Sequence, residues 1–494
     1  MMKHIAYTLL LACLLASCSA GHENAVKQNR LPHIYPDYAG VTIPVNIAPL
    51  NFLLRDSTVT ETEVVLTCKG TAAAENGGQH SLSVTGHGNA VQFGMDEWKS
   101  FLQKATGGKV SVQVYACGED GVWKEYKPFA WNVTGDSIDP YLTYRLIEPD
   151  YEAWNKLQIK QRCIENWDEK TLADHNLQEN RCMNCHAFGN QDARLSMMYV
   201  RGPGGGAILN RNGRLRKLDL KTDSLVSSSV YYGFSPSGRY VTFSTNVIIP
   251  AFHANAAKRL EVYDTKSDVY VADLDRNIIL SSPLTCDTAR LETFPTFSPD
   301  GRYIYYCVAD RDGLRTENLK GLHYNLVRIP FDERTGQIAT DASLVDTLYK
   351  ARSVCHPRIS PDGRFLLFTV ADYGTFPIWH PEADLCMIDL RTGRVDSLPA
   401  VNSRRSDTYH SWAHNSRWFV FASKRDDGLY GKPYFCYVDR RGKAHKPFLL
   451  PQQSPSFYDD CLKSFNIPEL SRGSVPYDAV DIEEAMRLPA EKFK

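Results

Sequence analysis

Four stretches in the second half of the chain share one pattern: YYGFSPSGRYVTFS (231–244), FPTFSPDGRYIYYC (294–307), HPRISPDGRFLLFT (356–369) and HSWAHNSRWFVFAS (410–423). Each begins with an apolar strand, continues through a tight turn and ends in an aromatic-rich strand. The first three turns contain Ser-Pro-Asp/Ser-Gly, in which proline presets the backbone and glycine supplies a left-handed conformation. The starting residues 231, 294, 356 and 410 are separated by 63, 62 and 54 positions. This long period is typical of a repeat architecture.

A second hairpin follows each stretch, so that one repeat contains four strands. Four strands per repeat is the unit of a β-propeller blade. The segment GRLRKLDLKTDSLVSSS (213–229) reads as the outer half of a further blade. We therefore expect a five- or six-bladed propeller over residues 205–450, with ring closure by strands from both ends of the chain as one option.

These stretches resemble the PD40 (WD40-like) repeats of TolB-family proteins. The last one is the most similar, in the Ser423-Lys424-Arg425 sequence at its end. The resemblance covers about half of the chain and implies a TolB-like propeller, a fold that by itself says little about function. Two departures weaken a TolB-like role in envelope integrity: the insertions between strands are longer, and a cofactor motif precedes the propeller.

The N-terminus reads as a secretory signal of residues 1–17. A basic start precedes the apolar run IAYTLLLACLLA, which is too short for a stable membrane span. Leu15-Ala16-Ser17-Cys18 matches the lipobox of bacterial lipoproteins, so we expect Cys18 to be lipidated and residues 18–29 to form a tether. Ser19 after the cysteine favours the outer membrane, with the protein facing the periplasm. The alternative is an ordinary signal peptide with a chance cysteine.

The strongest chemical motif is Cys182-Met183-Asn184-Cys185-His186, the C-x-x-C-H signature of c-type haem attachment. Two thiols add to the vinyl groups of the porphyrin, and the histidine becomes the proximal iron ligand. We therefore predict one haem c bound through Cys182, Cys185 and His186. The alternative is a disulfide or thiol pair. The segment before it, DYEAWNKLQIKQRCIENW (150–167), has helical spacing, so residues 147–204 are predicted to form a short helical linker that carries the haem.

The sixth iron ligand is left open by the sequence. Met197 and Met198 lie eleven and twelve residues after His186, and His175 lies eleven residues before it. Met197 or Met198 is the favoured choice. His175, a distant histidine or an open coordination site are the alternatives.

Residues 30–146 alternate between apolar and polar positions in about six or seven short segments, which predicts an immunoglobulin-like β-sandwich with one helix, DEWKSFLQKA. Cys68 and Cys117 could form a disulfide in this domain. Residues 451–494 contain several prolines and read as an extended arm with one helix, DIEEAMRL. The fold class is thus mainly β: sandwich, helical haem linker and propeller.

Charge and motifs exclude several function classes. The chain has 56 basic and 57 acidic residues, and this balance argues against nucleic-acid binding. No catalytic constellation is recognisable, so we expect a protein that is not an enzyme. The favoured function is electron transfer in the cell envelope, with the propeller as a docking platform for an unidentified redox partner. The alternative is a non-redox TolB-like scaffold for other envelope proteins.

Overall fold

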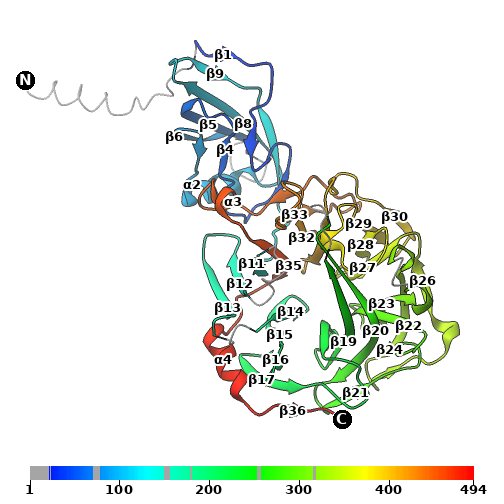
Figure 1. Cartoon of the computed structure of the whole chain (residues 1–494). Helices are drawn as coiled ribbons and strands as arrows, with labels where there is room; N and C mark the ends of the chain where they lie inside the picture. The colour runs from blue at the N-terminus through cyan, green and yellow to red at the C-terminus, as the bar shows by residue number, and fades with distance from the viewer. Residues whose placement is uncertain are drawn as a thin grey trace, which may run out of the picture.

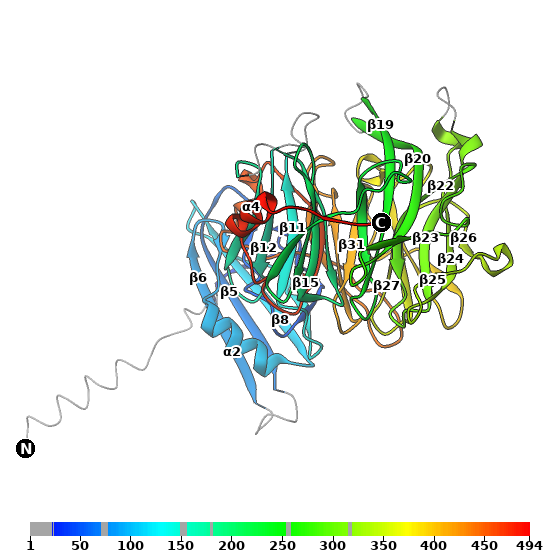
Figure 2. The same ribbon diagram turned by 90° about the horizontal axis from the view of Figure 1, so that it is seen from below.

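The computed structural model describes residues 22, 24–70, 78–148, 156–177, 181–252, 258–314 and 319–494. These residues form an N-terminal β domain and a ring of six β-sheets (Figure 1), seen from the side in Figure 2. The predicted mainly β fold with a propeller is therefore confirmed. Among these residues, no helix is long and apolar enough to cross a membrane.

The N-terminal domain contains two sheets and one helix. Its larger sheet has seven strands: β1 (Val26–Lys27), β3 (Thr42–Pro44), β5 (Val59–Lys69), β6 (Gln79–His87), β8 (Lys109–Gly118), β9 (Trp123–Glu125) and β10 (Phe129–Thr134). The smaller sheet has β2 (Ile34–Tyr35), β4 (Phe52–Leu54) and β7 (Ala90–Val91). The predicted helix is confirmed as α2 (Met95–Ala105). Phe129, Trp131 and Val133 of β10 are buried in alternation, as expected for a strand with one face in a core.

Six sheets surround one axis as propeller blades (Figure 1). Blade 1 has β35 (Ser464–Ser471), β11 (Tyr141–Ile147), β12 (Leu157–Cys163) and β13 (Glu169–Asp174). Blade 2 has β14 (Met183–Gly189), β15 (Asp192–Val200), β16 (Gly206–Arg211), β17 (Arg214–Asp219) and β36 (Glu491–Lys492). Blade 3 has β18 (Ser229–Phe234), β19 (Tyr240–Phe252), β20 (Leu260–Asp273) and β21 (Ile278–Leu280).

The other three blades follow in chain order. Blade 4 has β22 (Arg290–Phe297), β23 (Tyr303–Asp310), β24 (Asn325–Asp332), β25 (Gln337–Ile338) and β26 (Asp346–Tyr349). Blade 5 has β27 (Ser353–Ile359), β28 (Phe365–Ala371), β29 (Asp384–Asp389) and β30 (Arg394–Asp396). Blade 6 has β31 (Asp407–Trp412), β32 (Trp418–Ser423), β33 (Lys432–Tyr437) and β34 (Phe448–Leu449). Short helices α3 (Phe457–Asp460) and α4 (Ala479–Arg487) lie in the C-terminal arm.

The repeated turns join the innermost strand of a blade to the next strand. In blade 4, the Ser298 hydroxyl donates to Asp300 and accepts from the backbone N–H of Tyr303, which closes the turn. Gly301 then has a φ of +70°, a backbone conformation that glycine adopts without strain. The serine, aspartate and glycine of the repeated Ser-Pro-Asp-Gly sequence are therefore the residues that form this turn.

The helical linker predicted for residues 147–204 is wrong. Strands β12 and β13 complete blade 1, and β14 and β15 begin blade 2. In β12, Leu157 and Ile159 are buried while Gln158 and Lys160 are partly exposed, so the period is two rather than 3.6. The strands of the propeller consequently extend from Tyr141 to Lys492, beyond the expected range of 205–450.

The C-terminal arm closes the ring. Strand β35 is the innermost strand of blade 1 and pairs antiparallel with β11, so that Leu470 lies opposite Leu142. Farther along the arm, α4 begins at Asp478, whose carboxylate accepts from the backbone N–H groups of Val480 and Asp481. Strand β36 then pairs with β17. The arm thus belongs to the propeller and contributes to two blades.

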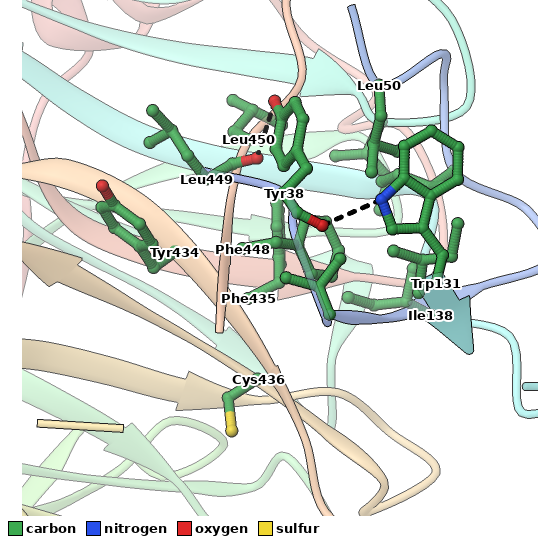
Figure 3. Packing of buried hydrophobic residues seen from close by; sticks show 14 of the residues in the cluster. Tyr38, Leu50, Trp131, Ile138, Tyr434, Phe435, Cys436, Phe448, Leu449 and Leu450 are labelled. Atoms are coloured by element: carbon green, nitrogen blue, oxygen red, sulfur yellow. Dashed lines mark hydrogen bonds between the residues drawn. The ribbon is translucent and has the colours of Figure 1, made fainter. Parts of the chain in front are cut away.

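One apolar core extends from the N-terminal domain into blades 5 and 6. Figure 3 shows where the two parts meet. The indole of Trp131 donates to the carbonyl of Tyr38 at 2.8 Å, and the Tyr38 hydroxyl donates to the carbonyl of Leu449 at 3.3 Å (Figure 3). Because they share a core, the N-terminal domain and the propeller form one packed body.

Candidate haem-attachment site and propeller channel

The C-x-x-C-H motif lies on the innermost strand of blade 2. Cys182 comes directly before β14, and His186 is in the middle of this strand. Both residues are buried, with 5% and 6% of their surface exposed. The side chain of Cys185 is outside what the structure describes. The motif thus belongs to a propeller strand, not to a separate helix.

A β-bulge interrupts β14 at the motif. Asn184 pairs with Tyr199 and Ala187 pairs with Met197, so β14 has one more residue than β15 over this interval. The innermost strands of the other five blades have a bulge at the same place. The register makes Cys185 the counterpart of the bulge residues Ile467, Tyr231, Phe294, His356 and Tyr409, which all have a φ between 49° and 57°.

Four of these bulge residues meet in the propeller channel. The ring centroids of Tyr231 and Phe294 are 4.4 Å apart, those of Phe294 and His356 are 4.1 Å apart, and those of His356 and Tyr409 are 5.0 Å apart. Tyr231 and His356, from blades 3 and 5, are 6.3 Å apart. The bulges therefore direct side chains toward the axis, and the backbone of Cys185 occupies the equivalent position in blade 2.

His186 has an unusual environment. Both ring nitrogens are buried, and among the described residues neither makes a well-formed hydrogen bond, although backbone groups of Ile467 and Thr143 lie close to the ring. Burial lowers the pKa of His186 to about 4, and the positive charge of Arg145 acts in the same direction. Backbone groups of Ile467 and Thr143 oppose this shift. At neutral pH the imidazole is thus uncharged, which is the form that coordinates metal ions.

The donor chemistry of this site is compatible with a c-type haem. Such a haem needs thiols for the covalent links and a neutral imidazole with an available nitrogen. Cys182 carries a thiol, and His186 offers a nitrogen that no protein group uses. Within the described part of the chain, no group of three or more His, Cys, Asp or Glu side chains could hold a metal ion by itself.

The structure separates the candidates for the sixth ligand. Met198 packs in the same buried cluster as Cys182, between blades 1 and 2. Met197 packs on the opposite face of the blade, in the cluster that blade 2 shares with blade 3. The ring of His175 contacts the carbonyl of Leu157 at 3.1 Å, just after the outermost strand of blade 1. Of these three residues, Met198 shares its surroundings with the motif.

Two other cysteine predictions have different outcomes. Cys18 and the signal segment lie outside the described residues. The disulfide considered between Cys68 and Cys117 is wrong, because both cysteines are free. In the pairing of β5 with β8, Cys68 is opposite Val110 while Cys117 is opposite Glu61, so the two thiols lie far apart along the strands.

A second cluster of buried charged groups was not found from the sequence. His380 contacts Glu261 through Nε2 and Glu382 through Nδ1, at 2.9 Å each. Burial lowers the pKa of His380, but the hydrogen bonds to these carboxylates outweigh it and raise the pKa overall. Lys424 lies nearby, with its Nζ 3.1 Å from the ring centroid of Trp379. His380 and Glu261 of blade 3 are 119 positions apart in the chain, and no local sequence pattern predicts that they meet.

Comparison with known proteins gives similarity at the level of fold. No family model matches the chain, and no curated protein does. Among solved structures, an oligogalacturonate lyase in complex with manganese matches with a TM-score of 0.35 and 12% identity, over 54% of this chain and 66% of that one. An oligogalacturonate lyase from Vibrio parahaemolyticus has the same TM-score and identity, over 80% of this chain and 94% of that one. The propeller domain of the Trilobed protease from Pyrococcus furiosus matches with a TM-score of 0.31 and 9% identity, over 70% and 91%.

These matches are consistent with a β-propeller, and the chain spans 66% of the manganese-bound lyase. They also correct the expectation that the chain is not an enzyme. The similar structures include a lyase and peptidases, so the fold gives no ground for excluding catalysis. At this level of similarity they assign no activity to the chain.

Proposed function

We propose that this chain is a cell-envelope lipoprotein with one covalently attached c-type haem and that it transfers electrons. The observation that carries the proposal is His186: a buried, uncharged imidazole without a well-formed hydrogen bond, in a C-x-x-C-H motif. A buried polar group without a well-formed hydrogen bond is costly and calls for an explanation, which an iron ligand would give. The alternative of a plain scaffold leaves this cost unexplained.

Each residue of the motif has a separate role in this proposal. Cys182 and Cys185 would hold the porphyrin through thioether bonds, and His186 would bind the iron. A bound haem would supply one-electron redox chemistry. The protein contributes burial, which keeps water away from His186 and keeps the imidazole uncharged. Met198, in the same cluster as Cys182, is the proposed sixth ligand.

The location and partner are part of the same proposal. The sequence of residues 1–18 supports export and lipidation at Cys18, and covalent haem attachment in bacteria takes place outside the cytoplasm. A lipid anchor at the outer membrane would hold the propeller in the periplasm, where it could dock an envelope redox protein.

The test is a pyridine haemochrome of the full chain, expressed with the haem-attachment machinery. We expect a c-type spectrum that survives denaturation and acid-acetone extraction. The Cys182→Ser, Cys185→Ser double variant should lose this spectrum. Cys68→Ser with Cys117→Ser is the matched control and should keep it, since these cysteines lie in the N-terminal domain.

A colourless wild-type protein would overturn the proposal and leave the TolB-like scaffold as the better interpretation.

A second measurement addresses the sixth ligand. Met198→Leu should remove the red charge-transfer band of methionine-ligated ferric haem, whereas Met197→Leu should retain it.

A further inference from the structure

Lys424 is a buried cationic side chain without an acceptor. It directly follows β32 and has only 3% of its surface exposed. Among the described residues, its Nζ makes no hydrogen bond and no ion pair. A buried ammonium without a counter-ion costs several kcal/mol, at roughly the level known for broken buried ion pairs. Either the Lys424 amine is uncharged in the folded protein, or an anion that is not part of the described residues serves as its counter-ion.

The contact with Trp379 does not satisfy Lys424. Its Nζ lies over the indole at 3.1 Å from the centroid, and a cation–π contact of this kind is favourable. However, an ammonium carries three N–H donors, and one ring face can accept only part of them. Burial consequently holds the pKa of Lys424 well below its usual range.

The backbone fixes Lys424 in this place. Its N–H donates to the carbonyl of Ser406 at 3.0 Å. The Ser406 hydroxyl donates in turn to the carbonyl of Pro377 at 2.8 Å, at the start of the short 3-10 helix η5 (Pro377–Trp379) that ends in Trp379. Hydrogen bonds therefore connect the backbone of Lys424 to Ser406, and Ser406 to the helix η5 that contains Trp379. These bonds hold Lys424 beside the indole.

Lys424 lies at the mouth of the propeller channel. Trp379 packs in one cluster with Tyr409 and Ile467, which are two of the bulge residues around the axis. Ile467 belongs to blade 1, next to blade 2, whose bulge position is Cys185. Ile467 also lies beside His186, so the cluster that contains Trp379 reaches a neighbour of the haem-attachment motif.

The carboxylates of this region contact groups other than Lys424, and among the described residues Oε1 of the buried Glu261 has no well-formed hydrogen bond. Glu261 and Glu382 contact His380, and the Asp427 carboxylate accepts from the backbone N–H groups of Leu429 and Tyr430. Asp427 favours the charged form of Lys424, but Arg259 is close enough to oppose it. Arg259 thus adds a second positive charge to the surroundings of Lys424, and no carboxylate of the described residues bonds Lys424.

We propose that Lys424, together with Arg259, binds a carboxylate at the mouth of the propeller channel. A carboxylate provides two oxygens for these donors and brings only one charge into surroundings made largely of Trp379, Ile378 and Leu260. A dianion would pay a larger desolvation cost there. The carboxylate has two potential sources. One is a propionate of the haem, which rests on the proposed function. The other is a free carboxylate ligand.

The test begins with the full chain made without the haem-attachment machinery. We expect sodium acetate to raise its melting temperature more than sodium chloride at the same ionic strength. Lys424→Met should abolish the difference, and Lys424→Arg should retain part of it. Lys99→Met removes an exposed lysine of α2 and should behave as wild type. If acetate gives no Lys424-dependent stabilisation, the proposal is overturned.

The haem-loaded protein distinguishes the two sources. If a propionate fills the site, acetate should no longer stabilise the protein, and Lys424→Met should lower the reduction potential relative to Lys99→Met. If the ligand is free, acetate should stabilise loaded and unloaded protein alike, with the potential unchanged. Absence of covalent haem in the wild type would refute the proposed function alone, because the acetate measurement does not depend on haem.

Discussion

Glu292 is a buried acid without a well-formed hydrogen bond among the described residues. It lies in β22 with none of its surface exposed, and the backbone of Asp287 lies close enough to its carboxyl group to oppose a rise of the pKa. Burial raises the pKa of Glu292 to about 8, and the nearby carboxylates of Asp268 and Asp287 add to this shift. The carboxyl therefore stays protonated at pH values where an exposed glutamate is ionised.

This shift predicts a pH-dependent stability. Between the unperturbed value of 4.5 and about 8, folded Glu292 retains a proton that the unfolded chain releases. Stability is thus lost as the pH rises through this window, by up to about 1.4 kcal/mol per pH unit. Glu292→Gln cannot titrate, so its free energy of unfolding relative to wild type should increase from pH 5 to pH 8 in urea titrations.

The exposed Glu61 provides the control for this measurement. Glu61→Gln should show the same pH slope as wild type. A Glu292→Gln variant whose slope equals that of wild type would show that the carboxyl is ionised in the folded protein and has a partner.

Strand β35 is the element on which ring closure depends. Leu470 in this strand is fully buried, whereas Leu462, just before the strand, is 63% exposed. Leu470→Ala should reduce the free energy of unfolding by about 2–5 kcal/mol, the cost of a cavity in a packed core. Leu462→Ala should change it by less than about 0.5 kcal/mol. Guanidinium unfolding of both variants measures the difference, and equal losses would contradict the pairing of β35 with blade 1.

The elements differ in how well the sequence predicts them. Blades 3 to 5 carry the Ser-Pro-Asp/Ser-Gly turn, whose residue types have a direct backbone cause. Blade 2 makes the same connection with Asn190 and Gln191, both with positive φ, and this turn lacks the repeated signature. In blade 1, strands from opposite ends of the chain pair, and no local pattern reveals such pairing. The false helix arose because the apolar residues after Tyr151 happen to follow helical spacing.

The candidate site was predictable only as a motif. The residue types of Cys182, Cys185 and His186 carry their chemistry wherever the chain places them. The structure places these residues on the innermost strand of blade 2, and it places Met197 and Met198 on opposite faces of that blade. Neither fact could be predicted from the sequence, because this segment was interpreted as a helix. Lys424 could not be recognised, because the absence of a partner is a property of packing alone.

At the scale of the whole molecule, a polar network connects the N-terminal domain to blade 6. The Asp426 carboxylate accepts hydrogen bonds from Tyr35 of β2 at 2.8 Å and from Lys432 and Tyr434 of β33 at 2.9 Å each. These partners hold the pKa of Asp426 below its usual value although burial opposes this. The network therefore adds a charged link to the shared apolar core.

Removal of this charge should destabilise both parts together. Asp426→Asn removes the nearer of two counter-ions of the buried Lys432 ammonium and leaves Asp427 at 3.9 Å, so it should cost about 3 kcal/mol. Tyr35→Phe removes two hydrogen bonds, one donated to Asp426 and one accepted from Lys432, and should cost about 2 kcal/mol. Calorimetry should show one transition that shifts as a unit. A separate early transition of the N-terminal domain would contradict a common packed body.

The late position of β35 in the chain sets an order of assembly. A polypeptide is synthesised from its N-terminus, so the strand with Cys182 and His186 is made nearly 280 residues before Ser464. Once β35 closes blade 1, Ile467 lies beside His186, and Cys182 is buried. If haem is attached to this motif as proposed, the enzyme that attaches it would reach Cys182 before β35 closes blade 1, because Cys182 is buried in the closed ring.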